Sequence, residues 1–164
     1  MTNTINIMNS SKIIAKQYEK YSKDPIENLS VEDPTKSNIY KWNFILTGPK
    51  DTPWEDELYN GIISFPQNFP FSPPEIKFTS KLFHPNVYSD GKVCISILHE
   101  GVDEYGYEET SERWSPVQTI GSIFLSIISL FHAPNCDSPA NVDASVMYQK
   151  DIKKFTKHIR LQSV

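Results

Sequence analysis

The side chains that could perform chemistry gather in residues 79–114, a stretch without a regular hydrophobic pattern. His84-Pro85-Asn86 comes first, Cys94 follows eight residues after Asn86, and His99 closes the run Cys-Ile-Ser-Ile-Leu-His. A thiol can act as a nucleophile, but a lone cysteine among Val, Ile and Leu is more often a small buried side chain. A histidine before proline is likewise more often a turn residue. The spacing therefore predicts a candidate nucleophile, Cys94, without an obvious catalytic base.

Common metal, hydrolase and nucleotide sites do not fit this stretch. The two cysteines and the histidines form no C-x-x-C or H-x₃-H pair, which argues against zinc, and the local signature of a papain-like cysteine hydrolase is missing. No glycine-rich phosphate loop occurs, so no nucleotide site is expected. Six acidic residues follow His99 without the spacing of a calcium loop: Glu100, Asp103, Glu104, Glu108, Glu109 and Glu112. Taken alone, this tract could simply be a solvated loop.

The elements ahead of this stretch are predicted as one helix and three strands. An apolar stripe at helical spacing predicts a helix over Ser11–Lys23, which Asp24-Pro25 ends. Three runs rich in β-branched and aromatic residues predict strands: 38–46, 59–65 and 75–78. Four prolines in residues 66–74 predict a stiff, extended connection that presents Phe69 and Phe71.

Helices dominate the part of the chain after this stretch. Ser115, Pro116 and Gln118 match a capping box that would open a helix at the start of an apolar run, ending at Ala133-Pro134. Because that run is apolar nearly all round, a buried central helix is expected. Two further helices are predicted over 140–149 and 151–161. The order of helix, three or four antiparallel strands and helices predicts an α+β fold.

Composition limits the class of protein. The 164 residues fit a single domain, with a core expected over about 11–161. The formal net charge of −4 argues against DNA or RNA binding, which requires a basic surface. Two cysteines are too few for a disulfide framework, and neither a signal peptide nor an apolar run long enough to span a membrane is visible. These features indicate a soluble, cytoplasmic protein.

Together, the order of these motifs resembles that of the ubiquitin-conjugating enzymes. The resemblance rests on the proline-rich run 69–74, the His-Pro-Asn element with Cys94 eight residues later, and Arg-Trp-Ser-Pro at 113–116 before a core helix. It covers roughly Ser11 to Leu161. The acidic insert ending in Glu-Arg-Trp, together with residues 138–145, is similar to the subgroup with an acidic active-site loop. The resemblance implies the family's fold, with a four-stranded antiparallel meander.

The resemblance also implies roles for individual residues. Cys94 would accept ubiquitin as a thioester from the activating enzyme and pass it to a lysine, so that no catalytic triad is needed. Asn86 would either donate to the oxyanion or hold the loop in shape, and His84 would fix the turn. His99 and Asp103 would orient or desolvate the incoming lysine, and Ser138 would occupy the gate position beside the cysteine. ATP would be used only upstream, by the activating enzyme, and no cofactor is expected.

Four residues are candidate contacts of a RING-type ubiquitin ligase: Phe71, Pro116, Lys12 and Lys16. The remaining implied partners are ubiquitin, the activating enzyme and protein substrates. Partners could also recruit the enzyme to the surface of the endoplasmic reticulum or to the nucleus.

The sequence departs from the family at Trp54-Glu55-Asp56-Glu57, where glycines usually follow the aromatic residue. Because Asp and Glu tolerate positive φ poorly, this loop is expected to change shape, at a place apart from the chemistry. Cys136 is expected to be non-catalytic. Two alternatives remain open at this point, an enzyme for a ubiquitin-like modifier and a non-catalytic ubiquitin-binding variant.

Overall fold

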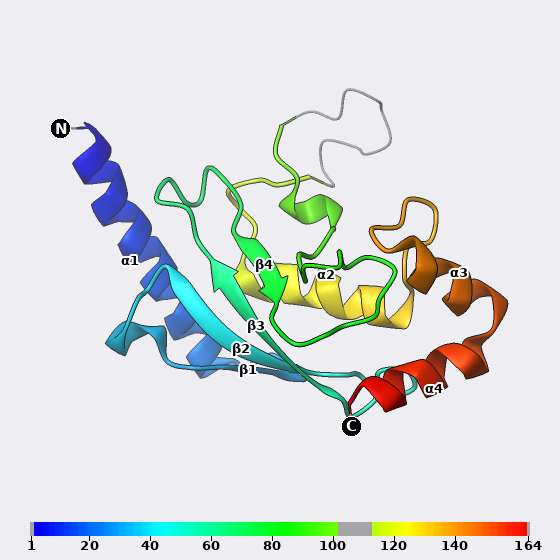
Figure 1. Cartoon of the computed structure of the whole chain (residues 1–164). Coiled ribbons are helices and arrows are strands. Elements are labelled where there is room, and N and C mark those ends of the chain that lie inside the picture. The colour runs from blue at the N-terminus through cyan, green and yellow to red at the C-terminus, as the bar shows by residue number, and fades with distance from the viewer. Residues whose placement is uncertain (1, 102–112, 164) are drawn as a thin grey trace.

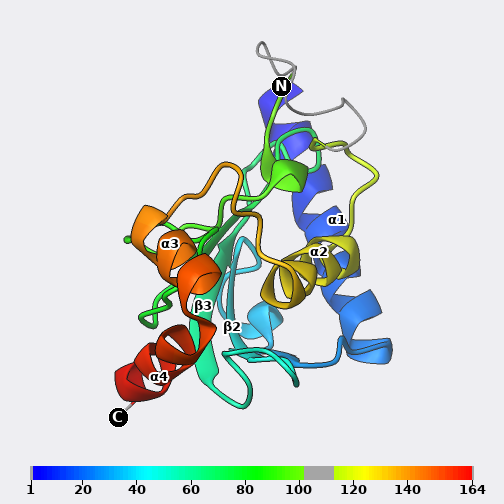
Figure 2. The ribbon, with the colours of Figure 1, turned by 90° about the vertical axis from the view of Figure 1, so that its right-hand side faces the viewer.

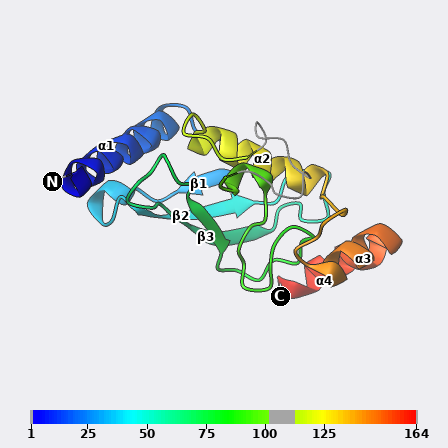
Figure 3. The ribbon, with the colours of Figure 1, turned by 90° about the horizontal axis from the view of Figure 1, so that it is seen from above.

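The computed structural model describes residues 2–101 and 113–163, with side chains from residue 9 onward. Its centre is an antiparallel sheet of four strands in the order β1-β2-β3-β4. Helices α1 and α2 form a layer on one side of the sheet, and α3 and α4 stack at the end opposite to α1 (Figures 1, 2 and 3). This confirms the predicted α+β meander.

The strands are β1 (Leu29–Val31), β2 (Lys41–Thr47), β3 (Leu58–Ser64) and β4 (Glu75–Phe78). Three of them match the predicted runs, whereas β1 was not predicted from its own pattern because three residues carry no recognisable alternation. In β2 the side chains of Trp42, Phe44 and Leu46 are buried and those between them are exposed. Trp42 pairs with Ile63 of β3, which aligns the apolar faces of both strands.

Helix α1 (Thr2–Lys23) begins nine residues before the predicted start and ends where predicted, before Asp24-Pro25. Residues 2–10 include several Asn, Thr and Ser, which favour caps and turns over helix interiors, and the sequence pattern missed this part of the helix. Tyr18 lies edge-on to Trp42 at 5.7 Å between ring centroids, so α1 packs on the core face of the sheet. None of the helices that the structure describes is long and apolar enough to cross a membrane.

The central helix α2 (Ile120–His132) begins four residues later than predicted. Its N-cap is Thr119, which forms a capping box with Ser122, so the predicted box at Ser115 was wrong. Residues 115–118 form a turn instead, in which the Gln118 amide donates to the Ser115 carbonyl at 3.1 Å. The helix is also not buried all round, because Leu125 is 63 % exposed. It ends at Ala133, as predicted.

Helices α3 (Val142–Lys150) and α4 (Ile152–Gln162) are separated by Asp151 alone, which caps α4 by accepting from the Lys154 amide. Phe155 and Ile159 of α4 are buried, as their spacing predicted. Phe155 packs edge-on against Trp54 at 5.4 Å. The second pair of helices is thereby fixed to the loop that follows β2.

Candidate active site

The His-Pro-Asn segment forms a buried turn whose ring partners define the protonation state of His84. The backbone amide of Asn86 donates to His84 Nδ1 at 2.9 Å, so the ring proton resides on Nε2 and is donated to the carbonyl of Leu130 at 3.0 Å. Burial lowers the pKa of His84 to about 4, with the bond to Leu130 opposing the shift. His84 is therefore neutral near pH 7 and lies in the core, where it holds the turn against α2.

Trp54 lies directly beneath this turn. Its indole stacks on the His84 ring at 4.6 Å between centroids and donates through Nε1 to the carbonyl of Phe83 at 3.0 Å. Trp54, the aromatic residue at the start of this loop, thus supports the histidine, whereas the departing residues Glu55 and Glu57 contact Arg160 of α4. Asp56 in this loop adopts φ 63°, which is how the chain turns without the glycine.

Asn86 connects three segments of the site. Its side chain donates to the carbonyl of Asn135 at 2.7 Å and accepts from the Asn135 amide at 2.9 Å. Its own carbonyl accepts from the amide of Cys94 at 2.9 Å. The segment after α2 and the strand-like segment that carries the cysteine are therefore both bonded to this one residue, which is buried.

Cys94 is partly exposed, unlike the turn beneath it. A tight turn brings Tyr88 back beside it, with the Gly91 amide donating to the Tyr88 carbonyl at 2.8 Å and Gly91 at φ 94°. A Cβ at Gly91 would lie 1.9 Å from the carbonyl oxygen of Phe78, so only glycine fits there. The Tyr88 hydroxyl donates to Cys94 Sγ at 3.8 Å, and this contact raises the pKa of Tyr88.

Sequence reasoning did not assign Tyr88 to the site. The run Ser89-Asp90-Gly91 was the signal that could have found it, because these residue types favour a turn, and a turn there folds the chain back toward Cys94.

A hollow of about 350 Å³ opens beside the sulfur. Its lining includes Cys94, Tyr88 and His99, together with Pro74 and Glu75. The short 3₁₀ helix Ser96–Leu98 turns the chain so that His99 reaches this rim. His99 was a predicted site residue, and the structure places it in the same hollow as the cysteine.

The gate segment runs along the other side of the turn. The amides of Ala140 and Asn141 both donate to the carbonyl of Pro85, at 2.8 and 3.0 Å. Ser138, in the same segment, is exposed. Burial and then the thiol of Cys136 raise the pKa of Tyr148, which places Cys136 near α3. Asp103, the remaining predicted site residue, lies outside the described residues.

The candidate ligase contacts are all exposed, and two of them lie on loops that are bonded together. Phe71 is 73 % exposed, whereas Phe69 is buried, contrary to the expectation that both are presented. Trp114 Nε1 donates to the carbonyl of Pro70 at 2.9 Å, which joins the Phe71 loop to the turn that carries Pro116. Lys12 and Lys16 are exposed on α1.

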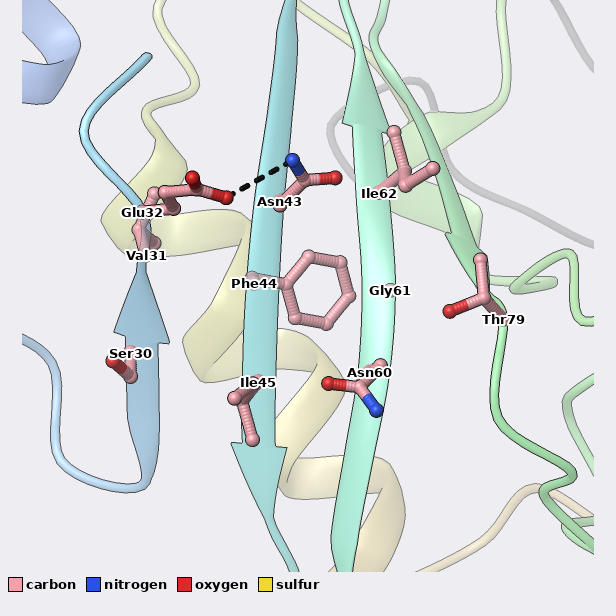
Figure 4. Close-up of a pocket in the computed structure, with 10 residues that line it drawn as sticks. All are labelled: Ser30, Val31, Glu32, Asn43, Phe44, Ile45, Asn60, Gly61, Ile62 and Thr79. Carbon is pink, nitrogen blue, oxygen red and sulfur yellow. Dashed lines mark hydrogen bonds between the residues drawn. The ribbon is translucent and has the colours of Figure 1, made fainter.

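A separate hollow of about 360 Å³ lies on the face of the sheet that α1 and α2 leave open (Figure 4). Its polar side chains include Asn43, which donates to Glu32 at 3.1 Å. No cysteine or histidine lines it, so it does not contribute to the chemistry at Cys94.

Comparison with known proteins agrees with this geometry. The family model for the ubiquitin-conjugating enzyme matches residues 13–163. The chain is 47 % identical over 151 residues to ubiquitin-conjugating enzyme E2 14 of Arabidopsis thaliana, covering 92 % of this chain and 90 % of that protein. It is 41 % identical over 152 residues to ubiquitin-conjugating enzyme E2 15 of Schizosaccharomyces pombe, covering 92 % and 91 %.

Human ubiquitin-conjugating enzyme E2 G2 is 44 % identical over 147 residues, covering 89 % of each chain. These matches extend across α1, the sheet and the helices that surround Cys94. The chain therefore belongs to the ubiquitin-conjugating enzyme family.

Proposed function

We propose that this enzyme accepts ubiquitin from the activating enzyme as a thioester on Cys94 and transfers it to lysine, on a substrate or on another ubiquitin, together with a RING-type ligase. The position of Cys94 carries the proposal. Cys94 is partly exposed and lines a hollow, while the His-Pro-Asn turn that supports its backbone is buried.

The first step is an exchange between two thiols. The Cys94 thiolate attacks the carbonyl carbon of the thioester on the activating enzyme, a new C–S bond forms, and the activating enzyme's thiolate leaves and takes up a proton. ATP has been consumed earlier, by the activating enzyme. No base is required from this chain, and His84 could not serve as one because both ring nitrogens are engaged.

In the second step, a lysine amine attacks the thioester carbon, the C–S bond to Cys94 breaks, and the amine loses its proton to solvent or a nearby group. Negative charge develops on the carbonyl oxygen. The side-chain nitrogen of Asn86 has two hydrogens and one is donated to Asn135, which leaves one to donate to this oxyanion. Holding the loop and donating to the oxyanion are thus compatible roles for Asn86.

Residues on two sides of Cys94 would contact the incoming lysine and orient its amine. His99 lies in the hollow beside Cys94, and Ser138 belongs to the exposed segment on the other side of the turn. We extend this role to Asp103 from the sequence alone. Deleting residues 102–108 should leave charging of Cys94 intact and impair chain extension, and equal loss of both would mean that the tract is structural.

Ligase binding is proposed for Phe71, Pro116, Lys12 and Lys16. All four side chains are exposed, and the bond from Trp114 to the carbonyl of Pro70 joins the loops that carry Phe71 and Pro116, which supports the assignment. An alternative is that the modifier is a ubiquitin-like protein, which competition between purified modifiers in the charging reaction would decide.

Formation of the thioester on Cys94 is the most direct test of the proposal. Incubation with activating enzyme, ATP and ubiquitin should shift the protein to a larger band that reducing agent abolishes. Cys94→Ala should form no such adduct, and Cys136→Ala, the matched control at the only other cysteine, should form it normally. An adduct on Cys94→Ala, or its loss in Cys136→Ala alone, would overturn the assignment of the nucleophile.

A further inference from the structure

A groove between α3 and α4 takes no part in the proposed reaction. It encloses about 580 Å³ and is lined by Phe83, by one face of each helix and by the residue between them: Asp143, Val146, Met147, Lys150, Asp151, Lys154 and His158. The α3 members recur at three- and four-residue steps, and Lys154 and His158 are four apart, so each helix contributes one side. Both helices lie on the side opposite to α1, the helix that carries Lys12 and Lys16 (Figure 2).

The floor of the groove is apolar and partly open to solvent. Phe83 is held in place by the rings of Phe155 and His158, at 5.4 and 4.4 Å between centroids. Val146 is 41 % exposed, and Val142 on the neighbouring turn of α3 is 62 % exposed. When an apolar group of a partner covers these side chains, their apolar surface is removed from water, and this burial favours binding.

The surface of α3 and α4 around the groove is basic, although the lining itself carries two carboxylates, Asp143 and Asp151, beside Lys150 and Lys154. Five of the 16 Lys and Arg residues of the chain lie within residues 150–160, where Asp151 is the single acidic residue. Four are exposed lysines that form no ion pair with any residue the structure describes: Lys150, Lys153, Lys154 and Lys157. Only Arg160 is paired, with Glu57 at 2.9 Å, and the carboxylate of Asp151 already caps α4.

We propose that this α3–α4 groove binds an acidic segment of a partner protein, which inserts one apolar side chain over Phe83 and Val146 while its carboxylates face Lys150 and Lys154. The exposed lysines between residues 150 and 157 outnumber the two carboxylates of the lining and favour an acidic occupant, in a protein whose overall charge is −4. The hollow favours a peptide over an anionic membrane, because a flat bilayer surface would leave the groove between two helices unfilled.

The test uses the full chain and a fluorescent peptide of glutamates around one central leucine, with fluorescence anisotropy as the measurement. The peptide should bind, and Lys150→Glu with Lys154→Glu should weaken binding about tenfold, because each exposed pair contributes up to about 1 kcal/mol and 1.4 kcal/mol is a factor of ten. The matched control is Lys36→Glu with Lys50→Glu, two exposed lysines elsewhere, which changes the net charge equally and should leave binding unchanged.

A peptide with serine in place of the leucine should also bind more weakly, since the hollow would stay empty. Three results would overturn the proposal: no binding of the peptide, equal weakening by both double variants, or no effect of the leucine. A fourth result would also overturn it: the protein binds vesicles of phosphatidylcholine and phosphatidylserine but not the peptide, and Lys150→Glu with Lys154→Glu weakens binding to the vesicles. Charging of Cys94 should be unchanged in both double variants, so that these outcomes are independent of the proposed function.

Discussion

Acid should destabilise this fold through one buried ring, that of His84. Burial sets its pKa at about 4 in the folded protein, against an ordinary value of 6.5. Because the folded value is the lower one, the unfolded chain binds the extra proton first, and stability falls as the pH drops from 6.5 toward 4. In the folded protein, His84 Nδ1 accepts a hydrogen bond from the backbone amide of Asn86. A proton on Nδ1 would point at this amide, and the hydrogen bond that closes the turn would be lost.

The magnitude follows from the gap between the two pKa values. At about 1.4 kcal/mol for each pKa unit, the full effect is about 3 kcal/mol, present above pH 6.5 and lost by about pH 4. Between pH 7 and pH 5 the loss should be about 2 kcal/mol. For a domain of ordinary stability this is a large fraction of the free energy of unfolding.

Urea denaturation followed by tryptophan fluorescence measures this loss, since Trp54 stacks on the histidine. His84→Gln cannot gain the proton, so it should lose about 2 kcal/mol less stability than the parent chain between pH 7 and pH 5, whatever its stability at pH 7. His132→Gln, at an exposed histidine, should keep the parent pH dependence. The reasoning is refuted if His84→Gln keeps the parent pH dependence, or if the His84 ring titrates near pH 6.5 by nuclear magnetic resonance.

Three further predictions concern the surroundings of the site. Trp54→Leu should lower the free energy of unfolding by about 3 kcal/mol in urea denaturation, because it empties space between several aromatic rings; a loss below about 1 kcal/mol would contradict this packing. Asp56→Gly should raise the midpoint of the same transition slightly, because glycine adopts φ 63° without strain, whereas Asp56→Val should lower it. Phe71→Ala should leave stability within about 0.5 kcal/mol of the parent and reduce ligase-stimulated discharge of the thioester; unchanged discharge would remove Phe71 from the ligase surface.

Local patterns predicted most of the fold because they are periodic. The alternation of Trp42, Phe44 and Leu46 set the faces of β2, and the spacing of Phe155 and Ile159 set the buried side of α4. The start of α2 was wrong because two capping signals overlap, at Ser115 and at Thr119, and the local sequence does not rank them. Strand β1 was too short to carry a period.

The sequence named candidate site residues but not the contacts that connect them. Cys94, Asn86 and His84 were named through the resemblance to the ubiquitin-conjugating enzymes, which does not report contacts between residues far apart in the chain. The stacking of Trp54 on His84 crosses 30 residues, and the paired bonds of Asn86 with Asn135 cross 49. Such contacts depend on how the sheet, loops and α2 pack, which single-sequence patterns do not encode.

The two ends of α2 have consequences for the mechanics of the enzyme. Its first turn follows the exposed loop that carries Pro116. The backbone amide of Ile120, in this turn, donates to the side-chain oxygen of Gln17 of α1 at 3.2 Å. Near its other end, the carbonyl of Leu130 holds the ring of His84. The two points lie about 15 Å apart along a helix with a rise of 1.5 Å per residue. One continuous helix therefore joins the contact with α1 to the turn that supports Cys94.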